Sequence, residues 1–138
     1  MRKLPEVEEA KALMLEAVDW SVMKWLREKK RVRKVADCAD DALDQLAKET
    51  KLRWPDELRA AYGAAQADAG ISNGVKQVKR ADEEASRARK DARNTFDEAE
   101  MQLSASMARE GCRKAIYSLE LHEKAIRTAE RLIPPQQG

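Results

Sequence analysis

The chain has 138 residues, of which 43% are apolar and 38% charged, with only five Gly, four Pro and one Phe. This length suits one domain over residues 1–138, and the scarcity of breakers and of β-branched or aromatic runs excludes a sheet protein and favours long helices. Because 27 basic residues nearly balance 25 acidic ones, any attraction to nucleic acid or anionic membranes must come from a local patch.

The first predicted helix runs from about residue 5 to residue 52. Pro5 suits the first helical position, and Glu6 and Glu8 place negative charge at the positive end of the helix dipole. No Gly or Pro follows until Pro55. Steps alternating between three and four residues predict a coiled-coil seam: Leu15, Val18, Val22, Trp25, Lys29, Val32, Ala36, Ala39, Leu43 and Leu46.

A second, shorter helix is predicted over about residues 55–69. Trp54-Pro55 predicts the break before it, because proline disfavours helical geometry in the preceding residue. The segment from Gly70 to Gly74 is the clearest predicted turn. Gly70 can adopt the left-handed conformation that ends a helix, and Ser72 can cap the next one.

The third predicted helix covers about residues 74–133 and carries two apolar frames. The first frame comprises Val75, Val78, Asp82, Ala85, Arg89, Ala92, Phe96, Ala99 and Leu103. The second comprises Met101, Ala105, Ala108, Cys112, Ala115, Leu119, His122, Ile126, Ala129 and Ile133. The change of frame near residues 99–105 implies a stutter or a rotation of the apolar stripe. Gly111 has helix-compatible neighbours, so we expect the helix to continue through it, because one isolated Gly costs only about 1 kcal/mol.

These elements predict an all-α fold built on a long antiparallel helical hairpin. Residues 5–69 and 74–133 would form arms of roughly 95 Å and 90 Å at ~1.5 Å per residue, with the tip at residues 70–74. We expect two such hairpins to dimerise into a four-helix bundle. The alternative is a compact three- or four-helix up-down bundle with a break at Gly111.

Residues 12–26 are apolar on nearly every side, and such a helix needs to be surrounded by protein. This predicts an interface with a second copy or another helical protein. Trp20 lies off the seam and is the best single candidate for a partner contact, since Trp is enriched at binding hot spots. The candidate interface residues are Leu13, Trp20, Met23, Trp25 and Leu26.

The segment Arg27–Lys34 carries six positive charges within about two helical turns. Such a run can contact phosphates, which makes a nucleic-acid-associated protein an alternative function. The competing interpretation is a solvated flank whose cations pair with acids on the other arm. The candidate phosphate contacts are Lys30, Arg31, Arg33 and Lys34.

The residues that usually carry chemistry form no motif. His122 is the only histidine and occupies an apolar-frame position, so we expect it to pack in the core or an interface. Cys38 and Cys112 are expected to be reduced, buried thiols, with a disulfide between the arms as the alternative. We therefore predict no catalytic, cofactor-binding or metal-binding residues and no enzyme activity.

The predicted function is a non-catalytic helical protein–protein interaction module: an adaptor, structural or regulatory coiled-coil protein. Its partner would be a second copy or another helical protein. A second alternative, beside the nucleic-acid one, is a helical-bundle enzyme or small-molecule binder. No apolar leader follows Met1 and the most apolar run, Ala12–Leu26, is too short to span a bilayer, so we expect a cytoplasmic protein without membrane contact.

Overall fold

The computed structural model describes residues 4–53 and 69–132, and every regular element in them is a helix. The helices are α1 (Pro5–Ala17), α2 (Val22–Leu26), α3 (Arg31–Arg53), α5 (Ala69–Gln102) and α6 (Ala105–Leu132). The predicted all-α class is confirmed. The predicted helix over residues 55–69 and the Trp54-Pro55 joint lie outside the described residues, apart from Ala69, which begins α5.

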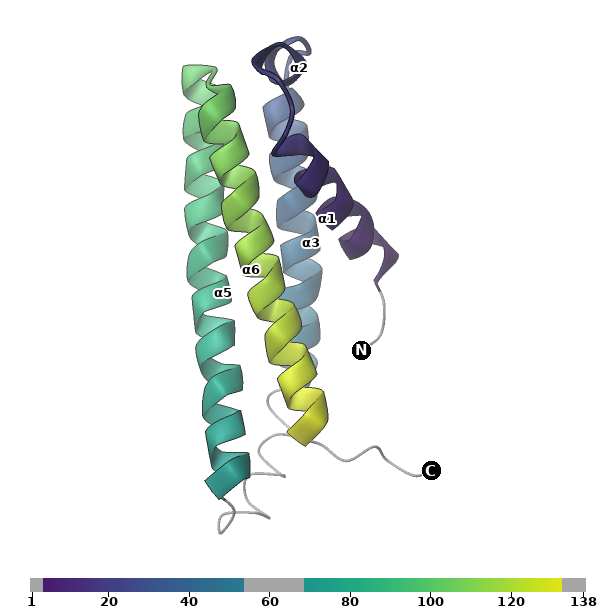
Figure 1. The fold of residues 1–138 in the computed structure, drawn as a ribbon, viewed down its shortest axis with the longest axis vertical. Coiled ribbons are helices and arrows are strands. Elements are labelled where there is room, and N and C mark those ends of the chain that lie inside the picture. Colours follow the sequence, from purple (N-terminus) through teal and green to yellow (C-terminus); the bar gives the residue numbers. More distant parts are fainter. Residues whose placement is uncertain (1–3, 54–68, 133–138) are drawn as a thin grey trace.

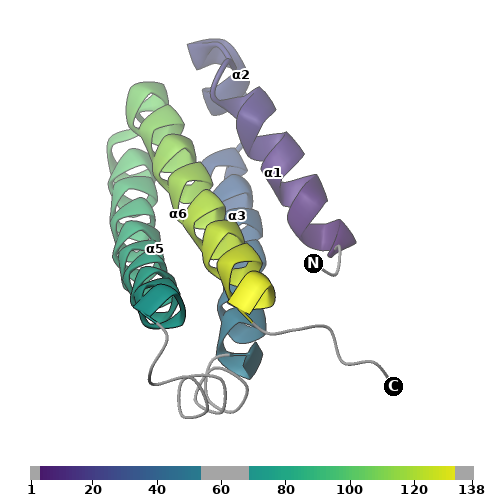
Figure 2. The same cartoon turned by 60° about the horizontal axis from the view of Figure 1, so that its bottom comes forward.

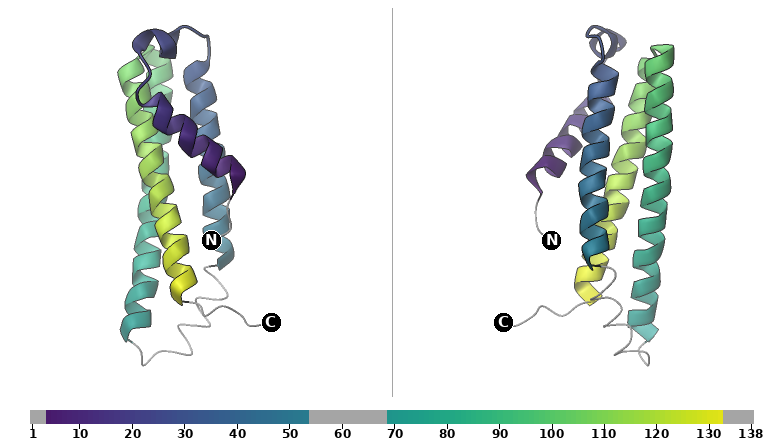
Figure 3. Two further views of the ribbon diagram at one scale, coloured as in Figure 1. Left: turned by 45° about the vertical axis from the view of Figure 1, so that its right-hand side comes forward. Right: turned by 180° about the vertical axis from the view of Figure 1, so that it is seen from behind.

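Three long helices, α3, α5 and α6, run side by side, and α1 lies obliquely across α3 and α6 (Figures 1 and 2). The short helix α2 sits at the end of the bundle where α5 turns into α6 (Figures 1 and 3). None of the described helices is both long enough and apolar enough to cross a membrane.

The prediction of one continuous helix over residues 5–52 is wrong, because the chain bends twice in this stretch. The helix starts at Pro5 as predicted, but α1 ends at Ala17. Ser21 then caps α2, its hydroxyl accepting a hydrogen bond from the backbone N–H of Lys24 at 3.1 Å. Between α2 and α3, Lys30 adopts a left-handed conformation with φ 68°.

Burial of Trp25 accounts for these bends. Trp25 is 0% exposed in the bent chain. Burying ~200 Å² of indole at ~25 cal/mol per Å² favours folding by about 5 kcal/mol. A left-handed residue such as Lys30 costs only ~1–2 kcal/mol. Folding α1 back across α3 and α6 also covers its own apolar face, namely Val7, Ala10, Met14 and Ala17.

The hairpin tip lies at Leu103 and Ser104, so the predictions of a turn at residues 70–74 and of an unbroken helix over 74–133 are wrong. Leu103 has φ 50°, its N–H binds the Glu100 carbonyl at 3.4 Å, and the Ser104 N–H binds the Ala99 carbonyl at 3.0 Å. This is the Schellman arrangement that ends many helices, here without glycine. The Ser104 hydroxyl then caps α6 by accepting from the Met107 N–H at 3.2 Å.

The three glycines in the described part of the chain lie inside helices rather than at turns. Gly70 and Gly74 lie within α5, and Gly111 lies within α6, so the alternative break at Gly111 is also wrong. A Cβ on Gly111 would stand 2.8 Å from the Phe96 ring, and one on Gly74 would stand 2.6 Å from Leu132. At residue 111 a side chain would press on the buried ring of Phe96, whereas at residue 74 it would meet only the flexible end of the Leu132 side chain.

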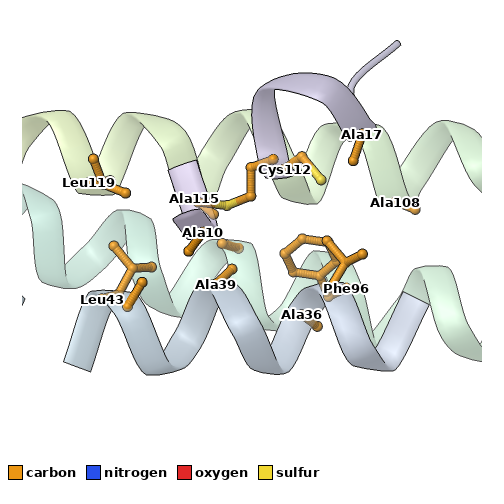
Figure 4. Packing of buried hydrophobic residues seen from close by; sticks show 14 of the residues in the cluster. Ala10, Ala17, Ala36, Ala39, Leu43, Phe96, Ala108, Cys112, Ala115 and Leu119 are labelled. Atoms are coloured by element: carbon orange, nitrogen blue, oxygen red, sulfur yellow. The ribbon is translucent and has the colours of Figure 1, made fainter. Parts of the chain in front are cut away.

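The core is rich in alanine (Figure 4). Small side chains let the helices approach, and Leu43, Phe96 and Leu119 fill the remaining space. Cys112 is buried in this core and Cys38 is partly buried, and both are free thiols, so the alternative of a disulfide between them is wrong for this structure. Burial raises the pKa of the Cys112 thiol to about 12 and also raises the pKa of Cys38.

Candidate docking surface at the α2 end of the bundle

Exposed apolar side chains gather at one end of the molecule. Among the described residues, seven large hydrophobic side chains are exposed, and five of them lie on α2 or at the α5–α6 turn. Met23, Met101 and Leu103 are the most exposed, at 77%, 81% and 71%. We call the exposed apolar residues of α2 and of the α5–α6 turn the α2-end surface: Val22, Met23, Leu26, Met101 and Leu103.

A hollow of about 320 Å³ adjoins the α2-end surface and shares two of its residues. Leu26 and Leu103 both line it, so the hollow joins α2 to the α5–α6 turn. Buried Trp25 and Val32 supply further apolar lining, while the remaining lining is charged: Arg27, Glu28, Lys29, Lys30, Arg31 and Glu100. The hollow therefore combines apolar walls with a mainly basic rim.

Two tryptophans hold α2 against the bundle. The Trp20 and Trp25 rings meet edge to face, with centroids 4.9 Å apart and planes at 63°. The Lys24 ammonium and the Arg31 guanidinium lie over the Trp20 ring, at 5.0 and 5.5 Å from its centroid. Arg109 of α6 donates a hydrogen bond to the Trp20 carbonyl at 3.0 Å. These contacts give a five-residue helix a defined position.

The predicted interface residues divide between the core and the surface. Trp25 is fully buried within its own chain, and Leu13 and Trp20 are partly buried against the core. Met23 and Leu26 are exposed and belong to the α2-end surface. Sequence reasoning placed Val22 on the seam and missed the two residues of the turn, Met101 and Leu103, although both fall where the apolar frames conflict.

The predicted phosphate patch is also divided. Arg33 reaches across to α5, with its Nη2 2.7 Å from Asp97 and its Nε 2.6 Å from Glu100. The hydrogen bonds to Asp97 and Glu100 raise the pKa of Arg33 above its already high ordinary value. Arg31 pairs with Glu28 at 2.7 Å. Arg33 thus pairs with acids of a neighbouring helix, as the competing interpretation expected.

Four other cations at this end have no ion pair with any residue in the described part of the chain. Lys30 and Lys34, from the predicted patch, are exposed, as are Arg27 and Lys29. Since the neighbouring carboxylates of Glu28 and Glu100 are already bound to arginines, the unpaired charge around the hollow is positive.

Two arginines of α5 join this helix to α3. Arg89 and Arg93 each place Nε 2.9 Å from the same oxygen of Asp40. Burial alone would raise the pKa of the Asp40 carboxyl, but the hydrogen bonds from both arginines hold it below its ordinary value. A groove of about 190 Å³ runs beside them, lined by these paired charges and by Ala36, Ala39, Ala92 and Phe96. Its charges are mutually satisfied.

His122 is 1% exposed, and its Nδ1 lies 3.9 Å from Asp82, too far for a hydrogen bond. Neither ring nitrogen has a hydrogen-bond partner among the described residues. Burial, followed by the charge of Arg89, lowers the pKa of His122 to about 4. The imidazole is therefore neutral near pH 7.

Within the described ranges, no three His, Cys, Asp or Glu residues come together as a metal site would require.

The fold and this surface define an all-helical bundle with one end that is both apolar and basic. No family model, curated protein or solved structure matches the chain.

Proposed function

We propose that this chain is a non-catalytic protein–protein interaction module that binds its partner through the α2-end surface. The observation that supports this most directly is the gathering of five exposed apolar side chains from two distant parts of the chain. Exposed apolar side chains gathered on one part of a protein surface often mark an interaction site. Elsewhere in the described ranges, the large exposed apolar residues are Leu15 on α1 and Tyr117 on α6.

The way α2 is held supports the same proposal. A five-residue helix has little stability by itself, since helices this short do not form alone in water. Trp25 in the core and the Arg109 hydrogen bond to Trp20 fix its position. A partner then loses little binding energy to ordering the surface, because the surface is already organised.

The charge around the hollow favours a different protein over a second copy as the partner. A twofold dimer through this end would bring the unpaired Arg27, Lys29, Lys30 and Lys34 of both copies together, and like charges across an interface weaken binding. Nucleic acid is the weaker alternative, because Arg33 is committed to Asp97 and Glu100.

Site-specific photocrosslinking tests the proposed function. A benzophenone amino acid replaces Met23 or Leu103 in the full chain, produced in the cells that naturally express it. The matched controls carry the same group at Leu15 or Tyr117, which are each 52% exposed but lie away from the α2-end surface. We expect discrete protein adducts from the first pair only. Equal adducts from all four positions, or none, would refute the proposal, and adducts of twice the chain mass would show a homodimer.

A further inference from the structure

We infer that the α2-end surface recognises an acidic segment of its partner protein that inserts large apolar side chains into the hollow beside Leu26 and Leu103. This inference rests on the proposed function and adds the chemistry of the partner. The apolar hollow has three cations at its rim, Arg27, Lys29 and Lys30, that form no ion pair with a described residue.

The apolar part of the site requires apolar anchors. The hollow, at about 320 Å³, lies at the small end of the range of binding pockets, which is roughly 300–1,000 Å³. Trp25 and Val32 are buried beneath Leu26 and Leu103, so the lining is held by the core and stays in place without a ligand. Side chains such as Leu, Met or Phe fill such a space, and the exposed, flexible side chains of Met23 and Met101 on the same α2-end surface can adapt to a partner.

The charged part of the site requires carboxylates. Arg27, Lys29 and Lys30 line the hollow without an ion pair to any described residue, whereas Glu28 and Glu100 are neutralised by Arg31 and Arg33. Asp or Glu residues flanking the anchors would complete the pairing of these cations. Complementary charges of this kind speed association and exclude basic partners.

Other anionic partners fit the surface less well. A nucleic-acid phosphate backbone would satisfy the cations but leave Met23, Met101 and Leu103 against a polar surface. An anionic membrane would accept both the apolar and the basic side chains. However, a membrane surface does not fill a hollow with walls from two elements.

Peptide display on the purified full chain tests this inference. A random peptide library is selected on the wild-type chain, with counter-selection on the Met23→Glu variant. We expect the enriched peptides to carry excess Asp and Glu around two or more large apolar residues. Enrichment of basic or uncharged peptides, equal enrichment on the variant, or no enrichment would overturn the inference.

Fluorescence anisotropy with an enriched peptide then measures the contributions of the site. We expect Met23→Glu to weaken binding about tenfold or more, the effect of losing roughly 1.4 kcal/mol. Arg27→Glu with Lys29→Glu should weaken it similarly, and added salt should weaken wild-type binding. The matched controls are Leu15→Glu and the pair Lys76→Glu with Lys79→Glu, exposed residues elsewhere that undergo the same changes in charge.

Loss of binding in these controls as well would contradict the assignment of the site. Vesicles of phosphatidylcholine with phosphatidylserine, and duplex DNA, provide the remaining comparison. Binding to either that is tighter than to the peptide and lost in Met23→Glu would replace the inferred partner. If photocrosslinking succeeds while the selection yields no acidic peptides, the proposed function stands and this inference fails.

Discussion

Replacing Gly111 with Ala should destabilise the protein, although the same change stabilises most exposed helix positions. A Cβ at residue 111 would lie 2.8 Å from Cδ1 and 2.9 Å from Cγ and Cε1 of Phe96. Carbon atoms in favourable contact are about 3.5–4.0 Å apart. Phe96 is 2% exposed and sits among core residues, so its ring has little room to move away.

The magnitude follows from two opposing terms. Ala gains about 1 kcal/mol over Gly in a helix interior. Overpacking a filled core costs about 1–3 kcal/mol. We therefore expect Gly111→Ala to lower the free energy of unfolding by about 1 kcal/mol, which corresponds to a fall in Tm of roughly 4 °C for a chain of this length.

Urea and thermal unfolding of four proteins measure this effect: wild type, Gly111→Ala, Phe96→Leu and the double variant. In the double variant the smaller side chain makes room for the new methyl group, so Gly111→Ala should cost less there than in the wild type. Asn94→Ala, at an exposed position of α5, controls for helix propensity alone. A higher Tm for Gly111→Ala, or equal effects of it in both backgrounds, would refute the close contact with Phe96.

Three further predictions follow from buried and paired groups. The pKa of His122 is lowered to about 4 in the folded protein, so the unfolded chain binds this proton more readily. The free energy of unfolding is therefore highest above pH 6.5 and falls as the pH is lowered towards 4, by at most about 3 kcal/mol. Over this range the urea midpoint should fall less in His122→Leu than in the wild type, and parallel curves would contradict this. Asp40→Asn should lower the free energy of unfolding by on the order of 1 kcal/mol, because the half-buried guanidinium of Arg89 loses its closest carboxylate. The effect should be smaller in high salt, and an effect that does not change with salt would argue against the ion pair. An alkylating reagent at neutral pH should modify Cys38 before Cys112, because Cys112 is fully buried and its thiol pKa is about 12. Mass spectrometry of the folded protein measures the order, and modification of Cys112 first would contradict the core packing.

Sequence periodicity identified the buried faces of α3 and α6, but it was wrong for the seam residues Leu15, Val22 and Lys29, which are exposed. The predicted seam residues Val32, Ala36, Ala39, Leu43 and Leu46 are all buried in α3. The second frame is likewise buried along α6: Ala105, Ala108, Cys112, Ala115, Leu119, His122, Ile126 and Ala129. These positions were predictable because the side chains of one helix face recur every three to four residues whatever the helix packs against.

The prediction of a stutter between the two apolar frames was wrong, because the chain reverses direction there at Leu103 and Ser104. A stutter and a turn both shift the apolar stripe, and Leu103 is not a residue that usually signals a left-handed helix end. Gly70, Gly74 and Gly111 are such residues, but two of them serve close packing between α5 and α6. Glycine has two structural uses, and only the distance to the neighbouring helix distinguishes them.

The sequence predicted only the α2 part of the candidate surface. The excess of apolar residues between 12 and 26 indicated that some must face a partner, and Met23 and Leu26 are exposed. Met101 and Leu103 lie more than seventy residues away along the chain, and only the α5–α6 reversal brings them to the same end. No local pattern in the sequence carries that juxtaposition.

The sequence by itself determined that this protein is helical, which face of α3 and α6 is buried, and that its apolar residues exceed what one helix can bury. Tertiary structure alone decided where the chain bends and which cations pair with acids. The physical reason is that periodicity and propensity act within a few residues, whereas burial of Trp25 and pairing of Arg33 with Asp97 depend on helices distant in the chain. Those longer-range gains exceed the small local costs of the left-handed residues Lys30 and Leu103.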